Sequence, residues 1–256
     1  MPFVPEIVYH YTTVDGLFTI ISENQIWATD IEFLNDAEEL LYARDPVLNE
    51  IEKRASNLDP KPEEHFQTPE ASRASILRNV ANYLKKYENN EIRYHHVYVS
   101  CFCEEGDLLS QWRAYGSEGG YALGFRTDKL MQVTTHFKRS PVRLEQIIYG
   151  IENAWEMLSS ALDRVATNPT AHPGTQAEFQ FGTLVLPQLA LIKHPSFLEE
   201  KEWRLIIIGY TGDTGLSFRP SALGLVPYTE VALPADALVK VVVGPGNERD
   251  LKIRRL

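Results

Sequence analysis

Three segments of the chain place polar or aromatic side chains where strand patterning expects apolar ones. They are Tyr9-His10-Tyr11-Thr12, the stretch Ser100–Tyr121 with Trp112 inside it, and Phe197–Arg204 with Glu200 and Glu202. In an extended strand, Glu200, Glu202 and Arg204 share one face, because successive side chains point to opposite faces. A carboxylate pair at the mouth of a strand is a candidate catalytic feature.

Each of these residues also has a purely structural interpretation. His10 fits a hydrogen-bonded core histidine, and Trp112 and Tyr115 fit aromatic side chains that pack against a sheet. Glu202 and Arg204 fit an ordinary ion pair on one strand face. Both interpretations stay open at the level of sequence.

The two cysteines and the remaining histidines do not form a metal motif. Cys101 and Cys103 are two residues apart on one strand face, so they are expected to be packing residues rather than a disulfide. No second Cys or His pair has ligand spacing, so no metal is expected. The other histidines are expected to be solvated or in loops: His95, His96, His136, His172 and His194.

The elements that would position the candidate residues begin with a strand over Glu6–His10 and another over Ile26–Thr29. Between them, Thr12 as N-cap and Asp15 three residues later predict a capping box and a helix. Four apolar residues of this helix have helical spacing and fall on one face: Val14, Leu17, Phe18 and Ile21.

The rest of the chain predicts a single α+β domain over residues 1–256, with a helical insertion at about 36–90 that is broken at Pro46. Residues 142–149 are open to strand or helix. The other predicted elements are strands at 97–103, 120–125, 203–208, near Val231 and at 238–243, and helices at 151–167 and 176–194, the second kinked at Pro187.

Composition favours a soluble protein. There are 35 acidic and 25 basic residues, a formal charge of −10, which opposes non-specific binding to phosphate backbones. No apolar stretch approaches 20 residues, so no membrane association is expected, and the first residues have no secretory pattern. Cytoplasmic localisation is expected.

The same segments carry a resemblance to an uncharacterised bacterial family, a domain of unknown function. Its members share a Tyr-His-Tyr-Thr opening, a Ser-Gln-Trp-Arg-Ala-Tyr-Gly segment and a Glu-Trp-Arg strand. The corresponding segments here are 9–12, 26–29, 34–36, 99–121 and 197–205, with a weak match at 244–245. The resemblance itself fixes no activity.

The order His10, Ser100 with Tyr121, Glu202 also resembles the ADP-ribosyltransferase superfamily, although the Ser-Thr-Ser triplet of some branches is missing. This resemblance implies an ADP-ribosyltransferase-like mixed sheet with flanking and inserted helices. It implies that NAD is a substrate and that no glycine-rich loop is needed. Glu202 would stabilise the ribosyl cation, as carboxylates do in glycoside cleavage.

The resemblance also implies roles for the other candidates. His10, Tyr11 and Thr12 would hold NAD, with Ser100 on a middle strand and Trp112 or Tyr121 against nicotinamide. Glu200 would position or activate the acceptor, in the manner of a Glu-x-Glu pair. His10, Ser100 and Glu202 lie in three separate strand-like segments, so they are expected to converge around one cleft.

The functional expectation is therefore an NAD-dependent ADP-ribosyltransferase, with a toxin or a phage-defence effector as the biological setting. The acceptor would be a protein or a nucleic acid, and an antitoxin or other protein partner is a further expectation. Two alternatives stay open: a non-catalytic protein-binding module that uses Trp112–Tyr115 as an exposed surface, and an NAD glycohydrolase.

Overall fold

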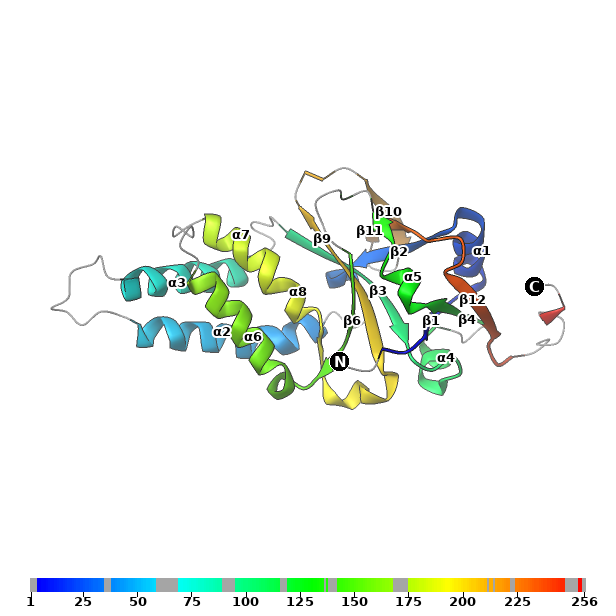
Figure 1. Ribbon diagram of the computed structural model, residues 1–256, viewed down its shortest axis with the longest axis horizontal. Coiled ribbons are helices and arrows are strands. Elements are labelled where there is room, and N and C mark those ends of the chain that lie inside the picture. Colours follow the sequence, from blue (N-terminus) through cyan, green and yellow to red (C-terminus); the bar gives the residue numbers. More distant parts are fainter. Residues whose placement is uncertain are drawn as a thin grey trace.

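The computed structural model is a mixed α+β structure with a curled antiparallel sheet, with a group of helices at one end (Figure 1). It describes residues 4–34, 38–58, 69–88, 95–115, 119–135, 137, 142–167, 175–210, 212–213, 215–221, 224–246 and 253–254. His136 and His172, which were expected to be solvated or in loops, lie outside the described residues.

In the described part of the chain the main sheet has ten strands, and its principal path runs β10-β11-β2-β3-β1-β4-β12. Off this path, β5 pairs with β11, and β9 pairs with both β3 and β6. Its strands are β1 (Ile7–Thr12), β2 (Gln25–Asp30), β3 (His95–Cys103), β4 (Tyr121–Arg126), β5 (Thr134–Thr135), β6 (Arg143–Gln146), β9 (Glu202–Tyr210), β10 (Leu216–Ser221), β11 (Gly224–Ala232) and β12 (Leu238–Val243).

Strand β3 organises this sheet, because β9 pairs with it along its whole length, from His95 opposite Tyr210 to Cys103 opposite Glu202. On its other edge β3 has two partners in succession. Strand β2 pairs at Tyr98 and Val99, and β1 pairs at Cys103. Ser100–Phe102 therefore lie where β1 and β2 diverge.

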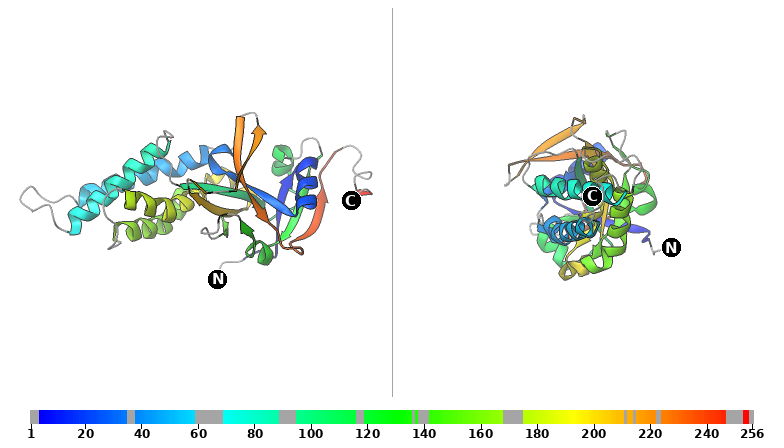
Figure 2. Two further views of the ribbon diagram at one scale, coloured as in Figure 1. Left: turned by 90° about the horizontal axis from the view of Figure 1, so that it is seen from above. Right: turned by 90° about the vertical axis from the view of Figure 1, so that its left-hand side faces the viewer.

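A helical layer packs beside one face of the sheet and extends away from it (Figures 1 and 2). Its helices are α2 (Glu38–Asn57), α3 (Pro69–Glu88), α6 (Ile151–Ala166), α7 (Thr175–Leu184) and α8 (Leu186–Leu189). They share one apolar cluster with Val97, Val99 and Ile206 of the sheet. Burial of this cluster fixes the helices against β3 and β9.

The other face of the sheet has its own core under α1 (Val14–Glu23) and α5 (Thr127–Leu130). Short elements complete the described chain: η1 (Ile31–Phe33), α4 (Leu109–Tyr115), η2 (Pro195–Glu200) and a two-stranded parallel sheet of β7 (Ile148–Tyr149) and β8 (Ile192–Lys193).

Most predicted elements are present at nearly the predicted bounds, and the segment 142–149 holds the two strands β6 and β7. The predicted break at Pro46 is wrong, since α2 continues through it. The missing Pro N–H costs the helix one hydrogen bond, but Ala43, Val47 and Ile51 are fully buried along the same helix. Their burial offsets that loss.

Candidate functional site

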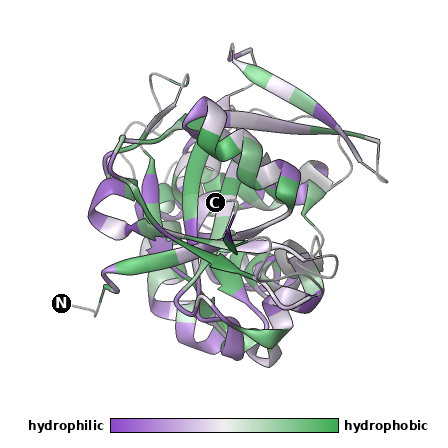
Figure 3. Cartoon of the chain, turned by 90° about the vertical axis from the view of Figure 1, so that its right-hand side faces the viewer, coloured by the Kyte–Doolittle hydropathy of each residue, from purple (hydrophilic) through white to green (hydrophobic). Residues whose placement is uncertain are grey.

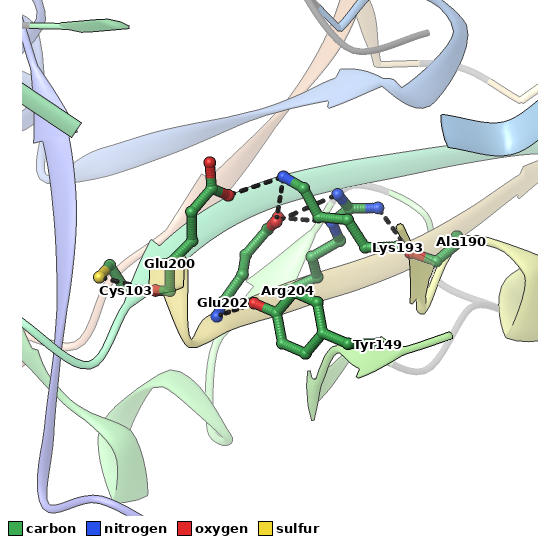
Figure 4. A network of polar contacts seen from close by, with 7 residues as sticks. All are labelled: Cys103, Tyr149, Ala190, Lys193, Glu200, Glu202 and Arg204. Carbon is green, nitrogen blue, oxygen red and sulfur yellow. Dashed lines mark hydrogen bonds and ion pairs between the residues drawn. The ribbon is translucent and has the colours of Figure 1, made fainter. Parts of the chain in front are cut away.

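The predicted catalytic carboxylate Glu202 lies in a buried network of charged groups at the start of β9 (Figure 4). Arg204 donates from Nε to Oε1 of Glu202 at 2.6 Å, and Lys193 donates from Nζ to Oε2 at 2.9 Å. The same Lys193 nitrogen lies 2.7 Å from Oε2 of Glu200. Two carboxylates and two cations thus neutralise one another, and Glu200 alone of the four is partly exposed.

Electrostatics keep Glu202 ionised. Burial is the largest influence on its pKa and would raise it, but attraction to Arg204 and Lys193 and their hydrogen bonds outweigh burial. The pKa falls from 4.5 to about 2. With 4% of its surface exposed, Glu202 is an anion whose charge is committed to two protein cations.

The network joins three parts of the fold. Arg204 donates from Nη1 to the carbonyl oxygen of Ala190 at 2.7 Å, directly after α8. The Glu202 N–H donates to the hydroxyl of Tyr149 in β7 at 2.8 Å, and the Cys103 thiol donates to the Glu200 carbonyl. Sheet, helical layer and η2 are therefore held at one point.

His10 lies in β1 and contacts the part of β3 between the segments that pair with β2 and with β1. Its Nδ1 is 2.9 Å from the carbonyl oxygen of Cys101. A carbonyl can only accept, so Nδ1 carries the proton and Nε2 of the neutral ring is the acceptor. Burial lowers the His10 pKa, although the hydrogen bond to Cys101 acts in the opposite direction.

His10 and Glu202 lie on opposite faces of the sheet. Glu202 is directly opposite Cys103, so these two side chains share a face. Tyr9 is also opposite Cys103, which turns its neighbour His10 to the other face, where it contacts Phe102 at 5.7 Å between ring centroids.

Ser100 also lies on the face away from Glu202, because its register partner is Leu205. It is 3% exposed, and its hydroxyl donates to the carbonyl of Trp27 at 2.7 Å. We expected His10, Ser100 and Glu202 to converge on one cleft from their order along the chain. That expectation is wrong, because register places them on two faces.

The remaining candidates are packed within the fold. The Tyr11 hydroxyl donates to the Glu105 carbonyl at 2.7 Å. The Tyr11 ring meets the Trp112 ring edge to face, with 4.7 Å between the ring centroids. Trp112 is 4% exposed, so the predicted exposed Trp112–Tyr115 surface is reduced to the three residues that follow it. Tyr121, the register partner of Thr12, is buried in the core under α1.

Lys193 and Tyr149 are the site residues that sequence reasoning did not single out. A signal for Lys193 existed, since it follows the buried run Leu189–Ile192. A lysine that ends such a run is rarely buried without a partner. Tyr149 gives no comparable signal.

Helix α1 leaves most of its predicted apolar face exposed. Leu17 and Ile20 are its buried residues, whereas Val14, Phe18 and Ile21 are 54%, 74% and 54% exposed. We call these three residues the α1 stripe. Figure 3 is viewed from the end of the molecule where α1 lies.

The ends of α1 are fixed in place. Its N-cap is Thr13 rather than the predicted Thr12, and the Thr13 hydroxyl accepts from the Gly16 N–H. At the other end, Asn24 adopts a left-handed conformation and its side chain donates to the Leu233 carbonyl at 2.7 Å. The α1 stripe is therefore carried by a helix held at both ends.

Comparison with known families gives one match, over residues 111–205, to a family described as a protein of unknown function (DUF2971). The matched span runs from α4 into β9 and includes Glu200, Glu202 and Arg204. It fits an uncharacterised domain and gives no link to ADP-ribosyltransferases. Comparisons with curated proteins and with solved structures give no significant match.

Among the described residues, no helix combines the length and the apolar composition needed to cross a bilayer.

Proposed function

We propose that this chain is a non-catalytic protein-binding module that presents helix α1 to a partner protein. The observation that carries the proposal is the α1 stripe, three apolar side chains at i, i+4 and i+7 with at least half of each exposed. Apolar side chains with this spacing on one helix are a recurring means of docking into a groove. Single exposed apolar residues are common, but an aligned set is not.

The fixed ends of α1 support this role. A helix that is already ordered loses little conformational entropy on binding, so more of the contact energy appears as affinity. Phe18 is the central residue of the α1 stripe, and a central aromatic side chain is typical of an interface hot spot.

The charges on α1 indicate the chemistry of the partner. Asp15 and Glu23 are exposed near its two ends, and the helix has no lysine or arginine. The partner is therefore a protein with an apolar groove rimmed by basic residues.

The buried network argues for the binding module over catalysis by Glu202. A carboxylate that stabilises a ribosyl cation has to face the substrate, whereas Glu202 faces Arg204 and Lys193. The network instead joins the sheet to the helical layer.

The test places a photo-crosslinking amino acid at position 18, with position 179 as control. Phe179 is 47% exposed but lies in α7, within the helical layer. A protein that is crosslinked from position 18 but not from position 179 is purified, and its Kd is measured for the wild-type chain and for Phe18→Ser. We expect Phe18→Ser to raise the Kd about 10- to 100-fold and the affinity to fall with added salt. Equal Kd values for the two proteins would reject α1 as the binding surface.

NAD-dependent ADP-ribosyl transfer is a second candidate, favoured by one observation. The hydrogen bond from His10 to Cys101 leaves Nε2 as an acceptor, which suits a ribose hydroxyl of NAD. Incubation of the protein with labelled NAD and lysate tests it, because transfer, hydrolysis and inertness give different products. Labelling that His10→Ala abolishes would support transfer, and an inert wild type would leave the binding module as the function.

A further inference from the structure

Strands β10 and β11 form a hairpin that projects from the body of the sheet (Figure 2). The register places Leu216 opposite Thr229, Phe218 opposite Pro227 and Pro220 opposite Leu225. Residues directly opposite each other share a face, and so do alternate residues of one strand. Leu216, Phe218 and Leu225 therefore lie on one face, which we call the hairpin face.

The hairpin face is exposed and apolar. Leu216, Phe218 and Leu225 are 37%, 56% and 67% exposed. Thr229 belongs to the same face, and its partner Ala28 in β2 lies in the core under α1. The hairpin thus extends a core-forming face of the sheet beyond the part that α1 and α5 cover.

This segment carries little charge. Residues 215–221 and 224–229 contain no aspartate or glutamate, although the whole chain has 35 acidic residues and a formal charge of −10. Arg219 is the one charged residue among them, and strand alternation turns it to the opposite face from Phe218. The hairpin face therefore has no charged side chain among its described residues.

We propose that the hairpin face is a self-association surface, with the hairpin of a second copy of this chain as its occupant. Two molecules that each carry a charge of −10 repel each other, so they approach at least cost where acidic residues are absent. Around a two-fold axis the same face meets itself, and an uncharged apolar face is self-complementary in that arrangement. Packing of one hairpin face on the other buries Phe218 and Leu225 without burying a charge.

The size of the surface sets the strength of this dimer. Stable interfaces bury about 1,200–2,000 Å² in total, and two six- to nine-residue strands supply only part of that area. A dissociation constant on the order of 10–100 μM is expected.

Sedimentation of the full chain tests the inference. Between about 1 and 200 μM, the weight-average mass should rise from 29.1 kDa toward twice that value, as expected for a dimer in that affinity range. Phe218→Lys and, separately, Leu225→Lys should each weaken association at least tenfold. Phe18→Lys is the matched control in α1 and should leave it unchanged.

Thermal unfolding checks that each variant is folded, which is expected because the substituted side chains are exposed. A constant mass of 29.1 kDa for the wild type over this range would overturn the inference. Association that is lost in Phe18→Lys but kept in both hairpin variants would overturn it too, by moving the contact to α1. Neither result depends on whether α1 binds a different protein.

Discussion

The side chain of Arg204 reaches back along β9 to Glu202, so that two residues of one strand face form a buried ion pair with 2.6 Å between Nε and Oε1. Lys193 closes the pair from β8. Residues i and i+2 of a strand are neighbours on one face, and this spacing lets a long guanidinium side chain meet the carboxylate.

Glu202→Gln should destabilise the fold strongly. The substitution keeps the shape of the side chain but leaves Lys193 and Arg204 buried beside a neutral group. Breaking a buried pair in this way costs about 3–5 kcal/mol, a decrease in Tm of roughly 10 °C for a chain of this length. Calorimetry measures the change.

Glu200→Gln is the matched control for that variant. The Glu200 side chain is 18% exposed, and Lys193 keeps its contact with Glu202 when Glu200 is neutral. We expect Glu200→Gln to lower the free energy of unfolding by about 1 kcal/mol. Equal effects of the two substitutions would contradict a central role for Glu202 in the network.

Stability should decrease on mild acidification because of His95. This residue is fully buried between β3 and the helical layer, against Phe179 and Tyr210, contrary to the prediction of a solvated histidine. Burial, with a smaller contribution from His96, lowers its pKa from 6.5 to about 4.

The direction of this pH dependence follows from proton binding by His95. Between pH 6.5 and 4 the unfolded chain binds a proton at His95 and the folded chain does not, so stability is complete above pH 6.5 and is lost as pH falls. The loss from this group approaches about 3 kcal/mol at pH 4. Urea unfolding of the wild type and His95→Phe at pH 7 and pH 5 measures it. The same pH dependence in both proteins would exclude His95 as its source.

Gly182→Ala should destabilise α7 despite the higher helix propensity of alanine. An added Cβ would lie 2.1 Å from Nδ1 of His95, a ring that has no room to move. Overpacking costs about 1–3 kcal/mol, against a gain of up to about 1 kcal/mol from propensity.

A double-mutant cycle identifies the cause of that loss. In a His95→Ala background the ring is gone, so Gly182→Ala should become neutral or stabilising. Additive effects of the two substitutions would show that the contact with His95 is not responsible.

Cys103 should react slowly with a thiol reagent in the native protein. It is 3% exposed, and burial is the main cause that raises its pKa to about 11. At pH 8 the thiolate fraction is about one in a thousand. Titration with a chromogenic disulfide should report Cys103 only after denaturation, and rapid modification of Cys103 in the folded chain would contradict this placement.

Local patterns of the sequence determined most of the secondary structure. Alternation placed β3, and apolar or β-branched runs placed β4, β9 and β12, close to their observed bounds. Helical spacing from Ile151 to Val165 placed α6. These patterns are local because strand and helix periods repeat within a few residues. The alternation also placed Glu202 and Arg204 on one face of β9. The prediction that Glu200 shares this strand is wrong, because Glu200 ends η2 and reaches the network through Lys193.

Tertiary structure decided which of the candidate residues meet. The pairing of Tyr9 and Glu202 with Cys103 fixes the faces of β1 and β9, and a shift of one residue in either register would move every side chain to the other face. Pairing depends on contacts between segments about 90 or more residues apart in the sequence, which no local pattern encodes.

The same limit applies to Lys193 and to the α1 stripe. Lys193 meets Glu202 only because β8 lies beside β7 and η2 turns the chain back into β9. In α1 the spacing allowed more than one apolar face, and packing against β1, β2 and β4 selected Leu17 and Ile20. Helical periodicity shows that a face exists, but the neighbours in space decide which face is buried and which is left for a partner.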